Sequence, residues 1–88
     1  MSSWRLKKAS RAVNKLFDMH FVVEKTGSMV TGSWERLMLV LSREVPNTGF
    51  SCFGRFMSMS INDDHVPLAL HVVNRFRPYG ELKVSVFE

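Results

Sequence analysis

The chain has 88 residues, of which 45% are hydrophobic and 23% charged, and its formal net charge is +4 at pH 7. This hydrophobic content exceeds that of disordered segments, and the length suits one domain with a thin margin of stability. The single cysteine, Cys52, excludes an intramolecular disulfide and favours a reducing compartment. We therefore expect a single domain over residues 1–88.

The basic N-terminus precedes no continuous apolar stretch, so a signal peptide is not predicted. The longest stretch between charges has about ten residues, from Val45 to Gly54, whereas a membrane span needs roughly twenty apolar residues. The expected location is the cytoplasm or the nucleus, and we expect a protein that is neither secreted nor transmembrane.

The surplus positive charge lies in residues 1–16, which hold five cations and no acid, while the remainder has seven Lys or Arg against eight Asp or Glu. At about 100° per residue, four of these cations, Lys7, Lys8, Arg11 and Lys15, share one side of a helix with Trp4, and the apolar side chains share the other side. This pattern predicts a basic amphipathic helix over residues 1–16 that binds an anionic partner. The predicted anion-binding residues are Trp4, Arg5, Lys7, Lys8, Arg11 and Lys15, with Arg75 and Arg77, expected in a loop before the last strand, extending the footprint.

The period of the hydrophobic pattern then changes to two over residues 17–24, which predicts a strand with one strongly buried face. Two glycines and several small polar residues over 25–32 indicate a loop. Ser33 is the expected N-cap of a second helix that Pro46 ends, since apolar residues from Trp34 onward recur at helical spacing. A strand over 37–41 is the competing interpretation of the same apolar run.

The remaining chain is typical of a three-strand meander. Its predicted strands are residues 50–61, with a bulge at Gly54, then residues 66–76 and 81–88. The order α-β-α-β-β-β predicts an α+β fold with two layers, in which an antiparallel sheet of about four strands carries two helices on one face.

The second face of this predicted sheet is too apolar for an ordinary solvated surface and too polar for a core. Either loops and long side chains cover it, or the chain self-associates through it as a homodimer. The predicted self-association residues are His20, Val22, His71, Val73 and Phe87.

No catalytic motif is present: the sequence lacks a phosphate-binding glycine loop, a dinucleotide fingerprint and a nucleophile elbow. Asp63, Asp64 and His65 are consecutive in a predicted turn and cannot all converge on one ion. Cys52 is expected to be a small buried hydrophobe and not a nucleophile. We expect no enzyme activity, no cofactor, no metal site and no small-molecule substrate.

Two partner classes match the basic helix. A nucleic acid, RNA or DNA, is favoured, because Lys and Arg contact phosphates and Trp4 can stack on a base. An anionic membrane surface is the next choice. The sequence lacks the signatures of an RRM, a KH domain or a zinc finger, so backbone attraction is expected without sequence-specific readout. The alternative function is a protein-protein interaction or assembly unit, such as a small accessory, matrix-type or adaptor protein.

Overall fold

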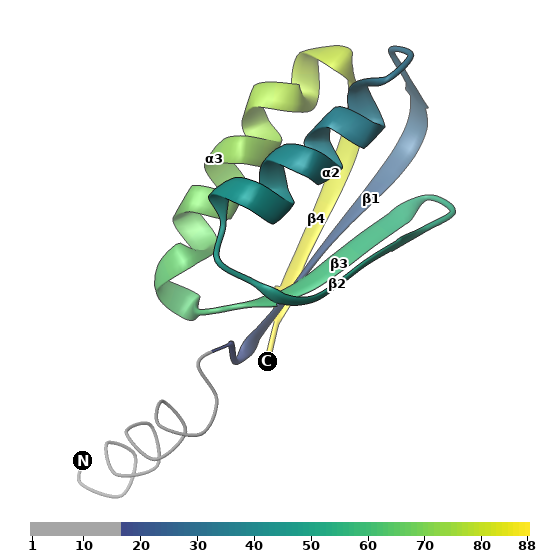
Figure 1. Ribbon diagram of the computed structural model, residues 1–88. Helices are drawn as coiled ribbons and strands as arrows, with labels where there is room; N and C mark the ends of the chain where they lie inside the picture. Colours follow the sequence, from purple (N-terminus) through teal and green to yellow (C-terminus); the bar gives the residue numbers. More distant parts are fainter. Residues whose placement is uncertain (1–16) are drawn as a thin grey trace, which may run out of the picture.

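The structure is a computed structural model that describes residues 17–88. Its elements in chain order are β1 (Met19–Met29), α2 (Ser33–Glu44), β2 (Thr48–Phe53), β3 (Phe56–Ile61), α3 (Val66–Phe76) and β4 (Gly80–Phe87) (Figure 1). Short 3-10 helices, Asp63–His65 and Arg77–Tyr79, flank α3. The predicted helix over residues 1–16 lies outside the described residues, and so do its predicted contacts Trp4, Arg5, Lys7, Lys8, Arg11 and Lys15.

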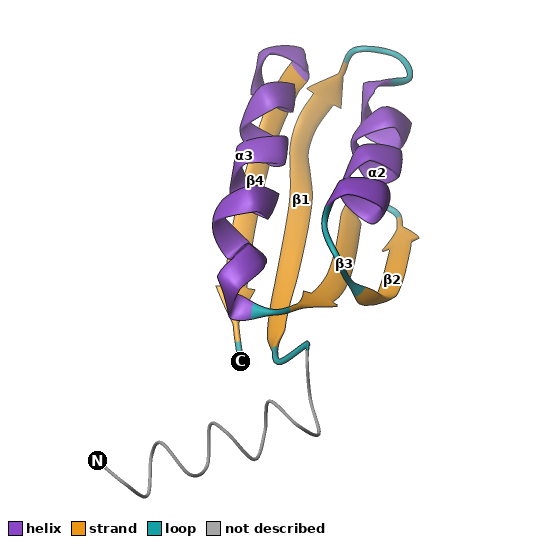
Figure 2. Ribbon diagram, turned by 60° about the vertical axis from the view of Figure 1, so that its left-hand side comes forward, coloured by secondary structure: helices purple, strands orange, loops and turns teal. Residues whose placement is uncertain are grey.

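The four strands form one sheet in the order β2-β3-β1-β4, and every neighbouring pair is antiparallel. Helices α2 and α3 both lie on the same face of this sheet (Figure 2). The order β-α-β-β-α-β, with one strand inserted between the two strands of each βαβ unit, is the ferredoxin-like split βαβ topology. The predicted class, a two-layer α+β fold with two helices on one sheet face, is confirmed.

The core lies between the helices and the sheet, and β1 runs through its centre because it pairs with both β3 and β4. The period of two in β1 places Phe21 and Val23 in this core, as the sequence predicts. The other buried apolar residues come from α2 and the residue after it, from β3, α3 and β4: Trp34, Leu37, Leu41, Val45, Met57, Met59, Ile61, Ala69, Val72, Val73, Phe76 and Leu82.

The predicted strand over residues 66–76 is wrong, because this segment forms helix α3. Its buried residues include Ala69, Val72, Val73 and Phe76, which share one side of a helix. Pro67 occupies the first turn, where a missing N–H costs nothing. The helix layer therefore consists of α2 and α3.

The predicted long strand over residues 50–61 is also wrong, since a turn at Gly54 divides it into the hairpin β2-β3. Gly54 has φ of 58°, the left-handed conformation that glycine adopts without penalty. Cys52 is exposed and not buried as expected. Its strand, β2, lies at the edge of the sheet, and only Phe50 of β2 is partly buried.

Strand β1 continues to Met29, where the sequence predicts a loop. The extension exists because Met29 pairs with Gly80 of β4, and the Val30 N–H donates to the Tyr79 carbonyl over 2.9 Å. A Cβ atom at Gly80 would lie 2.8 Å from the Ser28 carbonyl oxygen, so this close approach requires glycine.

The predicted second helix is confirmed as α2, although its first residue differs in role. Gly32 is the N-cap, and Ser33 is the first helical residue. The Ser33 hydroxyl donates to the Val30 carbonyl over 2.6 Å, which holds the turn that starts the helix.

Candidate functional site

The sheet face opposite the helices is the candidate functional surface, since α2 and α3 cover only the other face (Figure 2). His20, Val22 and Glu24 lie on this face because they alternate with the buried Phe21 and Val23. The strand register adds residues on both sides of β1: Ser60, Ser58 and Phe56 from β3, and Phe87, Ser85 and Lys83 from β4.

A shallow depression of about 360 Å³ lies at one end of this face. The His20 and Phe87 rings line it, with centroids 5.4 Å apart and planes tilted by 34°. Ser58 and Ser60 line its other side, and the Ser60 hydroxyl is 3.5 Å from Nδ1 of His20. Two aromatic faces beside hydroxyl donors and acceptors suit a planar ligand ring with polar edges. We call the depression formed by His20, Val22, Ser58, Ser60 and Phe87 the sheet pocket.

Two more aromatic side chains lie at the opposite end of the same face. Phe53 and Phe56 are register partners across the hairpin, and Phe56 also pairs with Glu24 of β1. Phe53, Phe56 and Phe87 are 70%, 40% and 52% exposed, which is unusual for side chains of this size. His20 and Glu24 are four positions apart on β1, which corresponds to about 13 Å along an extended strand. The sheet face thus has an aromatic cluster at each end.

The sheet face is not cationic. Lys83 lies directly opposite Glu24 in the register, and residues 17–88 hold seven Lys or Arg against eight Asp or Glu. The basic charge belongs to residues 1–16, which join the described chain just before β1. Lys15 is five residues before His20 in the sequence, so the basic segment directly precedes the strand that carries His20 of the sheet pocket.

Arg75 and Arg77, which are predicted to extend the anion-binding residues, do not lie in a loop as expected. Arg75 is in the last turn of α3 and forms an ion pair of 3.6 Å with Glu44 of α2. Arg77 is in the second 3-10 helix, where Nε donates to Oδ1 of Asn74 and Nη1 donates to the Leu82 carbonyl, each over 2.7 Å. Through these hydrogen bonds the Arg77 guanidinium connects the C-terminal turn of α3 to β4.

Three of the five predicted self-association residues lie together on the sheet face: His20, Val22 and Phe87. The placement of His71 and Val73 beside them is wrong. Both belong to α3, where helical geometry turns His71 to solvent and buries Val73 completely in the core.

The sequence interpretation missed Phe53, Phe56, Ser58 and Ser60 as members of this surface. A signal for part of the set was present, because residues 56–61 alternate as Phe-Met-Ser-Met-Ser-Ile. The methionines and the isoleucine of this run are buried, so the phenylalanine and the serines face outward.

Within residues 17–88, no group of three His, Cys, Asp or Glu side chains could hold a metal ion. None of the helices in that range is long and apolar enough to cross a membrane. No protein-family model, curated protein or solved structure matches the chain, so a function for it rests on the chemistry of its own surfaces.

Proposed function

We propose that this protein is a non-catalytic module that binds single-stranded nucleic acid. In this proposal the cations of residues 1–16 contact phosphates, and the sheet face contacts bases. The observation that carries it is the sheet pocket, where the ring faces of His20 and Phe87 lie beside the Ser60 hydroxyl. In the sequence, His20 closely follows the strongly basic residues 1–16.

The two parts supply different contributions to affinity. Phosphate contacts by Lys and Arg release counterions and attract any nucleic acid, whatever its sequence. A base that stacks on an aromatic side chain contributes about 1–3 kcal/mol, and every base has a ring face to offer. Because duplex bases are stacked on each other and only their edges are accessible, an open aromatic surface favours a single strand. The Ser58 and Ser60 hydroxyls can donate to or accept from the polar edge of a stacked base.

The sheet pocket is tested by Phe87→Ala. We expect the affinity for a fluorescently labelled single-stranded 12-mer to fall about tenfold, the loss of one stacked base. Fluorescence anisotropy at fixed salt measures this change, separately for RNA and DNA. Phe87 is half exposed, so the variant should keep the unfolding midpoint of the wild type.

Leu39→Ala is the matched control, because Leu39 is an apolar residue of α2 with comparable exposure. It should bind like the wild type. If Phe87→Ala also binds like the wild type, bases do not contact the sheet pocket. A protein that prefers duplex or anionic vesicles over single strands would contradict the proposal itself.

A second candidate function is self-association through the same face, as an assembly unit. The observation that favours it is the exposure of Phe53, Phe56 and Phe87 on one surface. Small serine side chains lie between them, and two such sheets could pack face to face at about 10 Å.

Sedimentation velocity over a range of concentrations tests this candidate. A dimer of the wild type should become a folded monomer in Phe56→Glu, because the new charge would be desolvated only in the dimer. Leu39→Glu, which changes charge equally on the helix layer, should leave the dimer intact. A wild type that is monomeric at every concentration excludes this function.

A further inference from the structure

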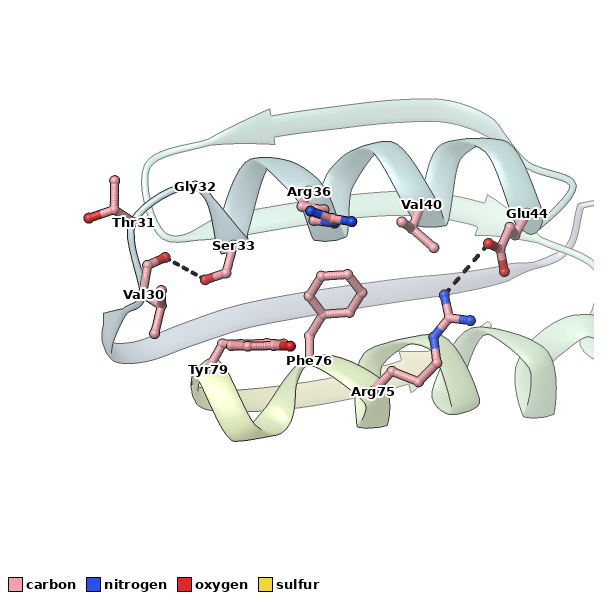
Figure 3. Close-up of a pocket in the computed structure, with 10 residues that line it drawn as sticks. All are labelled: Val30, Thr31, Gly32, Ser33, Arg36, Val40, Glu44, Arg75, Phe76 and Tyr79. Atoms are coloured by element: carbon pink, nitrogen blue, oxygen red, sulfur yellow. Dashed lines mark hydrogen bonds and ion pairs between the residues drawn. The ribbon is translucent and has the colours of Figure 1, made fainter.

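A second hollow lies on the other side of the molecule, between α2 and α3, and has a volume of about 700 Å³ (Figure 3). The Phe76 ring lies between the two helices at its centre, with Val40 above it on α2 (Figure 3). Val30 and Tyr79 close one end, where the Tyr79 ring centroid is 6.0 Å from that of Phe76. We call this hollow the helix cleft.

The charged side chains of the helix cleft are two arginines and one glutamate. Arg75 of α3 reaches Glu44 of α2 over 3.6 Å, and these side chains are 46% and 48% exposed. Such an exposed pair contributes little and exchanges readily. Arg36 of α2 forms no ion pair with any residue of the described chain. The lining therefore carries one guanidinium without an acidic partner and a second whose acid can be displaced.

We infer that the helix cleft binds a short acidic segment of a partner protein. A carboxylate of that segment contacts Arg36 and Arg75, and a neighbouring apolar side chain packs on Val30 and Tyr79, which are 58% and 47% exposed. Guanidinium groups bind carboxylates through two parallel hydrogen bonds, which gives the contact both strength and direction. The volume lies within the range of sites that enclose small ligands or a few side chains.

The charge and polarity of the helix cleft favour an acidic peptide over two other occupants, the chain's own residues 1–16 and a nucleic acid. The chain's own residues 1–16 hold five cations and no acid, so the arginines repel them. A nucleic-acid backbone would satisfy the arginines, but Val30 and Val40 are aliphatic parts of the accessible lining and offer no ring face on which a base could stack. A peptide that alternates acidic and apolar residues satisfies both parts of the lining.

The helix cleft and the sheet pocket lie on opposite faces of the sheet, so both can be occupied at once. This inference does not depend on nucleic-acid binding, and the two proposals can fail separately.

Selection of a displayed random dodecapeptide library on the full chain tests the inference. Enriched peptides should contain Asp or Glu next to a large apolar residue. A synthetic peptide of the enriched sequence should bind Arg36→Gln about tenfold more weakly than the wild type. It should bind Glu44→Gln more tightly, because Arg75 then has no competing carboxylate. Arg43→Gln, an exposed arginine of the same helix outside the cleft, should bind like the wild type.

Enrichment of basic peptides, no enrichment at all, or equal binding by Arg36→Gln would overturn the inference. Competition between the peptide and a single-stranded oligonucleotide would also overturn it, because the peptide would then occupy the basic residues 1–16 or the nucleic acid would occupy the cleft. Unfolding midpoints equal to that of the wild type establish that the variants are folded.

Discussion

Replacement of Lys7, Lys8, Arg11 and Lys15 by Glu should abolish binding to a single-stranded oligonucleotide. The substitution changes the charge of residues 1–16 from +5 to −3 and that of the whole chain from +4 to −4. If the wild type makes about four phosphate contacts through these residues, a plot of its log affinity for single strands against log salt concentration should have a slope near −3. Anisotropy titrations of the wild type at several salt concentrations measure this slope.

A pair of single substitutions separates a local effect from one of net charge. Lys8→Glu and Arg43→Glu change the total charge equally, but only the first should weaken binding markedly. Wild-type binding that does not respond to salt would rule out phosphate contacts by residues 1–16. Binding to anionic vesicles in preference to oligonucleotides would assign the same cations to a lipid surface.

Val73→Asp should unfold the protein, whereas His71→Asp should leave it folded. Val73 is completely buried between α3 and the sheet, and a carboxylate there has no partner, which costs several kcal/mol. That loss is comparable to the total stability of a domain of this size. His71 is exposed on the other side of α3. Circular dichroism during urea titration measures both variants.

This pair also distinguishes the helix from the strand that the sequence predicts for residues 66–76. In a strand, residues 71 and 73 share a face, so both substitutions would have similar effects. In a helix they are about 200° apart, and their effects should differ greatly. Equal tolerance of the two substitutions would contradict the structure of α3.

The sequence predicts β1 and β4 because apolar and polar residues alternate in each. It predicts α2 because apolar residues recur at helical spacing from Trp34 to Val45, although residues 37–41 alone also match a strand. The segment from Val66 to Phe76 is ambiguous, since it is apolar on most sides and rich in β-branched valine, which favours strands. Its period of two through Leu68, Leu70 and Val72 competes with the helical spacing of Ala69, Val73 and Phe76. Packing against the sheet decides between them, and that information is not local.

The residues of the candidate site are likewise only partly predictable from the sequence, because some of them come together through non-local pairing. His20, Val22 and Phe87 can be assigned to one face because their strands were predicted with the correct alternation. Ser58 and Phe56 join them only through the register between β1 and β3, and a single long strand over residues 50–61 conceals that pairing. The structure of residues 1–16, where the anion-binding residues are predicted, lies outside the described chain.

The central position of β1 has a consequence for how the protein folds. This strand comes first among the described elements, yet one of its edges pairs with β4, which comes last. Pairings between such distant segments require closure of a long loop, so folding should be slower than in a helical domain of equal length. His20 of β1 and Phe87 of β4, the two rings of the sheet pocket, come from these two strands. A chain whose β4 has not yet docked would therefore lack the sheet pocket, the surface on which we propose that a base stacks.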